Sequence, residues 1–425
     1  MIRYPVVSLV LVAGLASSPL AAQEVPVVSL DEALNSFVAN NLELRGARSR
    51  AAEAAGLARQ AGAYPNPLLS ASHEPLSGGG VTYSESYLTL SQRLEPPGQR
   101  GARTEAGDWR WRAARSRLLA DSVRLAFELK RTFVETSLSQ QKLDITGRVV
   151  QAFRDAARSA KDRFDAGDIS LYELRRIRVE RARFETLMVD ADVGLGVAQR
   201  SLALMVAPAE PAQRLAAGPL PADSPPPIPA DVLEISTVER RAELAAAQAD
   251  VEALEAGARL ARAERVPDVT ASGGFKRQSD GLRGAFLGLS VPLPFFDRRS
   301  GAVEAAEAGA SGGGDRLALT RRELENDVMR AAEAYGTLRR RSELVTEDED
   351  DTAAGAGDLL DIARVAYEAG EMELVELLDA AEALYQAGTA EARLKADLWI
   401  AYFDVERALG GFGPLTEIPT TEDQP

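Results

Sequence analysis

The sequence predicts a mainly α-helical chain with a smaller β part, written twice: each half holds one long helical hairpin and one pair of β-strands. Three observations carry this prediction. Short motifs recur at a separation of about 200 residues. Two runs of about 70 residues contain no proline and are dominated by helix formers. Ahead of each run lies a segment with strand-forming residues around a glycine-containing turn.

Composition excludes several classes of function. The 425 residues carry a net charge of −15, whereas a nucleic-acid-binding protein normally presents a basic face to phosphates. The chain has no Cys and a single His, so thiol nucleophiles, disulfide frameworks, Cys/His zinc sites and Ser-His-Asp triads lack their residues. We therefore expect no nucleic-acid partner, no catalysis and no cofactor.

Residues 1–22 read as a secretory signal peptide. They begin with Arg3, continue through an apolar run over 6–15 and end in small residues such as Ala21 and Ala22. A buried or amphipathic N-terminal helix is the alternative. The remaining chain has no run of about 18 apolar residues, which excludes a transmembrane helix but not a transmembrane β-barrel.

The internal repeat divides the chain. The matching motifs are Glu43-Leu44 with Glu243-Leu244, Tyr64-Pro65-Asn66 with Val266-Pro267-Asp268, Leu88-Thr89-Leu90-Ser91 with Leu287-Gly288-Leu289-Ser290, and residues 163–168 with 366–371. Four matches in the same order with a nearly constant offset indicate a duplication. We expect a first repeat over 23–207, a proline-rich linker over 208–230, a second repeat over 231–410 and an irregular tail over 411–425.

Each repeat opens with an alanine-rich helix that a proline closes. These helices are expected from residue 30 to about residue 63 and from residue 232 to about residue 265. Asp31 and Asp231 lie near their starts, where a carboxylate accepts hydrogen bonds from free amides and opposes the positive end of the helix dipole.

One β-hairpin is expected after each opening helix, within residues 68–94 and 269–291. Four aromatic residues in these segments are candidates for a lipid-facing girdle, with positions in the barrel interior or in loops equally open. They are Tyr83, Tyr87, Phe275 and Phe286.

The proline-free runs predict the long helices. They cover residues 98–165 and 298–368, about 100 Å each if continuous. The second is expected to bend or break at its glycine run, 312–314, and at its acidic cluster, 347–351. Each long helix ends in a glycine turn, Ala166-Gly167-Asp168 or Ala369-Gly370-Glu371. A further helix follows each turn, over residues 171–206 and 374–409.

The strand count limits what one chain can build. Four strands cannot close a barrel, and an open sheet edge is not tolerated in lipid. Several copies must therefore share one barrel. The same copies bring their long helices together around one axis, which makes a tube continuous with the barrel. An exported protein with this plan is therefore expected to form a channel.

The motifs of the chain resemble those of the TolC-type outer-membrane factor family over nearly all of the sequence after residue 22. The duplicated plan and the turn motifs around Gly167 and Gly370 carry this resemblance. A narrower set is similar to the CzcC-type, heavy-metal-efflux branch. That set is Pro65-Asn66-Pro67, residues 92–100 and residues 291–298.

The resemblance implies a homotrimer in the bacterial outer membrane. Its fold is a 12-stranded transmembrane β-barrel, to which each chain gives four strands, above a periplasmic α-barrel of helical hairpins. Its partners are outer-membrane lipid, a periplasmic adaptor and an inner-membrane pump of the RND type. Its function is that of a passive exit duct in a tripartite efflux system, with heavy-metal cations as the cargo of this branch.

The resemblance also assigns roles to the two turns. The tips that meet the adaptor correspond to Ala166, Gly167, Asp168, Ala369, Gly370 and Glu371. The acidic residues that line the periplasmic aperture correspond to Glu376 and Asp379, which three copies arrange as two negative rings that attract cations. A solvated acidic helix face is the alternative for these two residues, and plain helix termination is the alternative for the glycines.

Two further features are not interpreted as metal sites. His73 is the only histidine, and a lone histidine on a strand is more often a surface residue than a ligand. The acidic cluster at 347–351 lacks the spacing of an EF-hand, so a solvated acidic stretch is favoured.

Two other functions remain open on the sequence. A periplasmic adaptor also has long helical hairpins, but it needs β-rich segments flanking a single hairpin. A secreted coiled-coil structural protein has no reason to place a pair of strands at the same point of each half.

Overall fold

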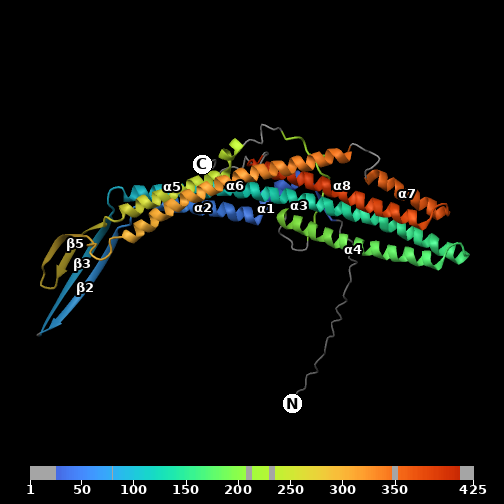
Figure 1. Cartoon of the computed structure of the whole chain (residues 1–425). Helices are drawn as coiled ribbons and strands as arrows, with labels where there is room; N and C mark the ends of the chain where they lie inside the picture. Colours follow the sequence, from blue (N-terminus) through green and yellow to red (C-terminus); the bar gives the residue numbers. More distant parts are fainter. Residues whose placement is uncertain (1–24, 79, 207–212, 229–234, 347–352, 412–425) are drawn as a thin grey trace, which may run out of the picture.

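The computed structural model describes residues 25–78, 80–206, 213–228, 235–346 and 353–411. The expected signal peptide, Asp231, the acidic cluster at 347–351 and all but the first residue of the expected tail lie outside these residues. The molecule is elongated: the strands form one end, and two helix-turn-helix ends form the other (Figure 1).

The first half contains two short helices, one two-residue strand, two long strands and two long helices. In chain order the elements are β1 (Val27–Val28), α1 (Leu30–Asn40), α2 (Leu42–Ala61), β2 (Leu68–Gly78), β3 (Val81–Leu94), α3 (Gln99–Ala166) and α4 (Leu171–Val206). The spine of the molecule is α3, which has 68 residues and is about 100 Å long. It packs against α2, α4, α5, α7 and α8.

The second half repeats this order after a short strand. Its elements are β4 (Ala216–Ala217), a 3-10 helix (Ile235–Arg240), α5 (Ala242–Ala263), β5 (Val269–Gln278), β6 (Arg283–Ser290), α6 (Ser300–Thr346), α7 (Ala353–Ala369) and α8 (Leu374–Ala408). Within the expected linker, β4 pairs in parallel with β1, which brings the linker back to the start of the first half.

The opening helix of the first half is two helices, where the sequence predicts one. The chain turns at Asn41, whose side-chain oxygen accepts a hydrogen bond from the Leu44 N–H at 2.9 Å and so caps α2. The same side chain donates to the Met205 carbonyl at 3.2 Å. A buried amide with two partners thus fixes a break that propensity alone does not show.

The glycine run at 312–314 does not break the second long helix, and this prediction is wrong. α6 continues through it. A Cβ atom at Gly313 would lie 2.7 Å from Leu254 Cδ1 of α5. Gly313 therefore lies where α5 and α6 approach closely and has a packing role, whereas a Cβ atom at Gly312 or Gly314 would meet no other atom within 4 Å.

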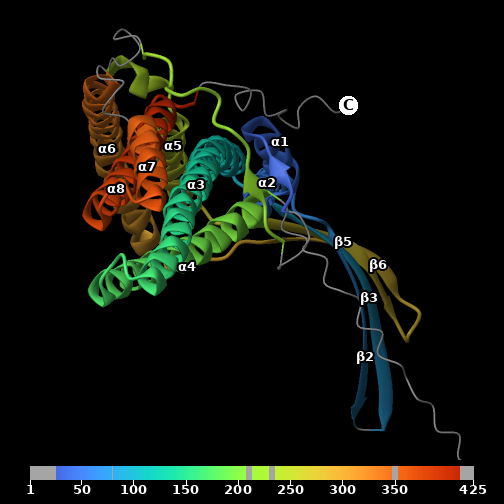
Figure 2. The ribbon, with the colours of Figure 1, turned by 90° about the vertical axis from the view of Figure 1, so that its right-hand side faces the viewer.

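The four long strands form one antiparallel sheet in the order β2-β3-β5-β6. The hairpins of the two halves are joined through β3 and β5, as the duplicated plan allows. Figure 2 shows that the sheet leaves the helical body as a separate arm. Among the described residues, no helix combines the length and apolar character that crossing a bilayer needs.

Candidate functional site

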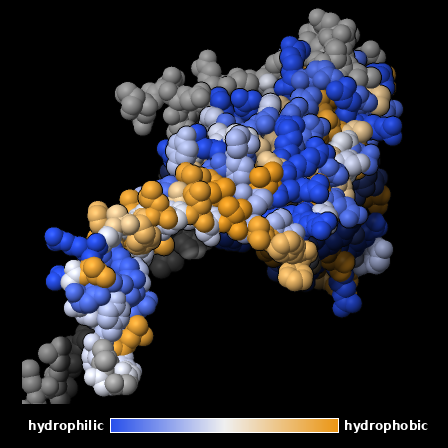
Figure 3. Space-filling model, turned by 90° about the vertical axis from the view of Figure 1, so that its left-hand side faces the viewer, coloured by the Kyte–Doolittle hydropathy of each residue, from blue (hydrophilic) through white to orange (hydrophobic). Residues whose placement is uncertain are grey.

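One face of the sheet is apolar and lies open. In a sheet the register decides which side chains share a face. The apolar face carries Leu69, Leu88, Leu90, Leu94, Val269, Ala271, Phe275, Ala285, Leu287 and Leu289. The exposed fraction reaches 91% at Leu287 and 70% at Phe275. In Figure 3 hydrophobic residues gather on this arm, beside the largely hydrophilic body. An exposed apolar face of this size indicates a surface that a membrane or another protein covers.

The opposite face is mainly polar and holds a charged cluster. Glu85 accepts hydrogen bonds from Lys276 Nζ at 2.9 Å, from Gln278 Nε2 at 2.8 Å and from the Tyr87 hydroxyl. The same face carries Ser70, Ser72, Thr89, Ser91, Thr270, Ser272 and Ser290. One layer of strands therefore separates an apolar surface from a polar one.

The register corrects the interpretation of the aromatic residues. Only Phe275 shares the apolar face. Tyr83, Tyr87 and Phe286 lie on the polar face, where the Tyr87 and Phe286 rings meet edge to face at 6.3 Å. The girdle interpretation is wrong for these three residues.

His73 lies exposed in the middle of β2. Its Nδ1 is 3.0 Å from the Ser86 hydroxyl oxygen. Within the described ranges, no three His, Cys, Asp or Glu side chains come together as metal ligands could.

Both outer edges of the sheet are open as far as the described residues go. β2 and β6 each have a hydrogen-bonded neighbour on one side only. Such an edge presents unpaired N–H and C=O groups that pair readily with another strand. An apolar face, a polar face and two open edges together fit one segment of a larger closed wall.

The two predicted turns lie at the other end of the molecule (Figure 1). α3 ends at Ala166, and Gly167 follows with a φ of 87°; α7 ends at Ala369, and Gly370 follows with a φ of 79°. Glycine adopts this left-handed region without strain, which explains why both helices end there. Asp168 and Glu371 come next and donate backbone hydrogen bonds to carbonyls of the preceding helical turn.

The two turns are in contact through one arginine. Arg163 Nη1 donates to the Tyr367 carbonyl at 3.4 Å, and the guanidinium lies 5.5 Å from the centre of the Tyr367 ring. The Tyr367 side chain is buried, and burial raises the pKa of its hydroxyl against the opposing effect of Arg163. Helix ends that are 204 residues apart in the sequence thus form one tip.

The two predicted aperture residues differ in their surroundings. Glu376 Oε2 accepts a hydrogen bond from the Glu373 N–H at 3.0 Å and completes a capping box at the start of α8. Glu173 makes the corresponding contact with Ser170 at the start of α4. Asp379 lies one turn further on, is exposed, and has no ion pair within the described residues. Both carboxylates point away from the helical core.

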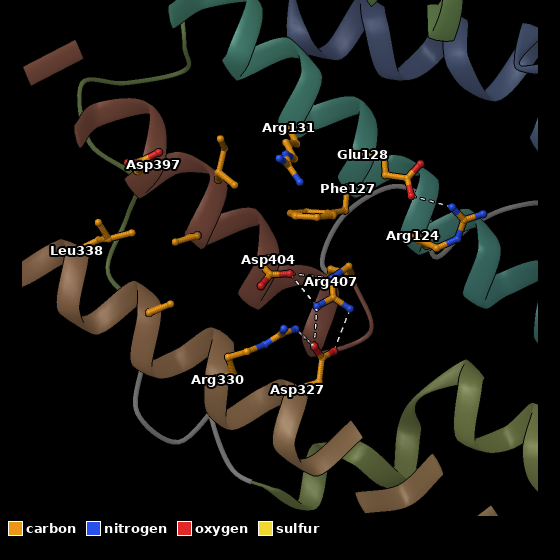
Figure 4. Close-up of a pocket in the computed structure, with 13 residues that line it drawn as sticks. Arg124, Phe127, Glu128, Arg131, Asp327, Arg330, Leu338, Asp397, Asp404 and Arg407 are labelled. Atoms are coloured by element: carbon orange, nitrogen blue, oxygen red, sulfur yellow. Dashed lines mark hydrogen bonds and ion pairs between the residues drawn. The ribbon is translucent and has the colours of Figure 1, made fainter. Parts of the chain in front are cut away.

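A partly buried ion cluster lies in the middle of the body, and sequence reasoning missed it. Asp327 of α6 accepts two hydrogen bonds from Arg407 at 2.9 Å and one from Arg330 at 2.7 Å (Figure 4). It accepts a further one from Arg241 at 3.0 Å. The Arg241 side chain is only 1% exposed. Burial on its own would raise the pKa of Asp327, but the hydrogen bonds from Arg407 and Arg241 outweigh it and lower this pKa to about 2.

The sequence gives no indication of this cluster because its members are isolated charges on helices or, for Arg241, at the N-cap of one, where charges usually face water. A hollow of about 710 Å³ adjoins it between α3, α6 and α8, with Phe127 and Arg131 on one wall and Asp397 on the other. The residues of the cluster satisfy one another, so their arrangement is structural.

The chain is similar to known outer-membrane channels in sequence and in fold. Residues 236–411 match the family model described as outer membrane efflux protein. The cobalt-zinc-cadmium resistance protein CzcC of Cupriavidus metallidurans is 26% identical over 384 residues, 90% of each chain. The solved structure of CusC has a TM-score of 0.74 at 18% identity and covers 93% of this chain and 96% of its own. The CmeC outer membrane channel of Campylobacter jejuni has a TM-score of 0.75 at 16% identity, and the match covers 90% of this chain and 86% of the CmeC chain.

Proposed function

We propose that this chain is an outer membrane efflux protein, the family whose model its residues 236–411 match, and that it serves as the exit duct of a tripartite heavy-metal efflux system. As a family member it is a channel of the outer membrane with a periplasmic helical part, and not an enzyme. The sheet carries the proposal: its apolar face, polar face and open edges fit a piece of barrel wall, and its strands lead into the long helices. A periplasmic adaptor or a secreted coiled coil has no use for such a sheet.

The duct is a homotrimer. Three copies of the four-stranded sheet supply twelve strands, and closing them removes every open edge from the lipid. The polar face, with Glu85 and Lys276, then lines the lumen. The helical hairpins of the same copies form the periplasmic tube below it.

The tip docks onto a periplasmic adaptor, which connects the duct to an inner-membrane pump of the RND type. The turns that join α3 to α4 and α7 to α8, and that contain Gly167 and Gly370, lie at the extremity of the body (Figure 1), where a partner can reach them. Apolar side chains beside them face outward: Tyr172 is 70% exposed and Val375 is 46% exposed. Exposed apolar residues at a tip of this kind favour a protein partner.

Divalent heavy-metal cations are the proposed cargo. CzcC, the relative described above, is by its name a cobalt-zinc-cadmium resistance protein. The net charge of −15 on this chain favours the passage of cations over anions. Glu376 and Asp379, repeated in three copies near the tip, form the negative rings through which the cations enter. The pump supplies the energy, and transport through the duct is passive.

The decisive experiment is fractionation of the cell envelope followed by native mass measurement of the detergent-extracted protein. We expect the protein in the outer-membrane fraction with the mass of three chains. A monomer in the soluble periplasmic fraction would contradict the proposal.

The aperture has its own test, in planar bilayers. The double variant Glu376→Gln, Asp379→Asn should lower the preference of the channel for cations, and glutamine retains the capping hydrogen bond to Glu373. Asp190→Asn is the matched control, since this exposed carboxylate on α4 lies about 28 Å along the helix from the tip. Equal selectivity in the double variant and the wild type would remove both residues from the aperture.

A further inference from the structure

Two arginines face each other on the apolar face of the sheet. Arg277 of β5 and Arg283 of β6 are direct partners in the register, and both are exposed. They lie on the same face as Phe275 and Leu287. Like charges placed directly opposite each other on neighbouring strands repel, so this pair needs an anion to stabilise it.

The described residues do not supply that anion. In the described part of the molecule, neither Arg277 nor Arg283 makes an ion pair or a side-chain hydrogen bond. Lys276 offers a direct contrast, because it points to the opposite face and pairs with Glu85 at 2.9 Å. The cation on the polar face is neutralised internally, whereas the two on the apolar face are left for an external partner.

The pair also lies where the apolar face ends. Along β3, eight residues separate Leu94, beside the helices, from Ser86, which pairs with Arg277. This distance is about 27 Å along the strand. With the strand tilt of about 40° that is usual in barrels, it spans about 20 Å of membrane, close to the apolar band of about 25 Å found in such proteins. The two arginines are therefore at the border of the band that is remote from the helices.

A hollow adjoins the pair. It has a volume of about 480 Å³, and Arg277 and Arg283 line it together with Leu88, Phe275 and Ala285; Lys276 also borders it, although its register position is on the opposite face. A ligand in this place meets cationic groups on one side and apolar groups on the other, which matches the junction between a charged headgroup and an acyl chain.

We propose that Arg277 and Arg283 bind the phosphate group of a phosphorylated lipid in the outer leaflet, with its acyl chain against Phe275. The inference rests on the proposed function, which places the helices in the periplasm and this end of the sheet at the outer surface. A guanidinium group suits the ligand because its fork of N–H donors matches two phosphate oxygens. The phosphate also removes the repulsion between the two arginines.

The test is native mass spectrometry of the detergent-purified protein titrated with bis-phosphorylated lipid A. Dephosphorylated lipid A and inorganic phosphate are the comparison ligands. We expect the phosphorylated lipid to bind more tightly than the dephosphorylated lipid by about tenfold or more, since charge-assisted hydrogen bonds are at stake. The double variant Arg277→Gln, Arg283→Gln should lose this preference, and Lys276→Gln, on the other face, should keep it.

Three results would overturn the inference: equal binding of the two lipids by the wild type, an unchanged preference in the double variant, or full displacement of the lipid by equimolar inorganic phosphate. The comparison of the two lipids on the wild type decides the question even if the double variant does not fold. Failure of the proposed function looks different, because the wild-type protein would then show no trimer mass and no outer-membrane location.

Discussion

The sheet and the helical body treat apolar and charged residues in opposite ways. In the body Phe133 and Phe153 are buried, and even the buried Arg241 is neutralised by carboxylates. In the sheet the apolar side chains are the most exposed ones, and the cluster around Glu85 lies on the other face. Helices packed on helices create their own core. A single layer of strands cannot, so its surroundings must supply the apolar partner, which under the proposed function is lipid.

The largest effect is expected in the body, at its buried charges. Asp327→Ala should destabilise the protein by about 3–5 kcal/mol, because it leaves Arg407 and Arg241 without their shared carboxylate. Chemical unfolding of the detergent-solubilised protein, followed by circular dichroism, measures this difference.

Asp397→Ala is the control for that substitution. Asp397 borders the same hollow, but its side chain is 44% exposed and lies 3.6 Å from a more exposed arginine, so its loss should cost no more than about 0.5 kcal/mol. Similar costs for the two variants would show that the cluster is not the buried network described above.

A charge placed on the apolar face tests the sheet in the same way. Leu90→Arg should cost about 2–4 kcal/mol and reduce the amount of assembled protein in the outer membrane, because the arginine then faces lipid. Thr89→Arg is the matched control on the adjacent residue, which faces the other way. If both variants assemble equally well, the two faces of the sheet have the same surroundings and the contrast with the body fails.

Acid separates the contribution of the buried cluster from that of the sheet. The folded pKa of Asp327, about 2, lies below its ordinary value of 3.8. The resulting stabilisation, about 2 kcal/mol, is therefore complete above about pH 4 and is lost as the pH falls through 2. The difference in unfolding free energy between the wild type and Asp327→Asn should shrink by this amount between pH 5 and pH 2. A difference that stays constant with pH would assign the stabilisation to other groups.

The sequence predicts well those features that local chemistry determines. Gly167 and Gly370 end their helices because only glycine adopts a positive φ freely, and this holds in any context. The strands near Val269 and Leu287 follow from alternation, which is also local. The mainly helical fold with four long strands is accordingly the one expected.

Features set by contacts between distant segments are not predictable in this way. The break at Asn41 depends on the Met205 carbonyl, far along the chain. The continuity of α6 through Gly313 depends on Leu254 of a neighbouring helix. The cluster at Asp327 joins residues from three separate segments, each of which resembles an ordinary surface charge when read alone. Of the site, the sequence could indicate the tips and the acidic residues, but not the sheet register that separates the two faces.

The smallest effect on stability is expected at the tip. There apolar side chains face water, whereas in the rest of the body they are buried. If Tyr172 serves docking, Tyr172→Ser should change the unfolding free energy by no more than about 0.5 kcal/mol and still weaken co-purification with the adaptor of the same host. Val189→Ser is the control, since Val189 is also on α4 and is 61% exposed, but lies away from the turn. If both variants lose the adaptor equally, the adaptor contacts α4 along its side and not only at the turn. If neither variant loses the adaptor, Tyr172 is an ordinary surface residue. Exposed apolar residues of the body would then need no partner, and only those of the sheet would.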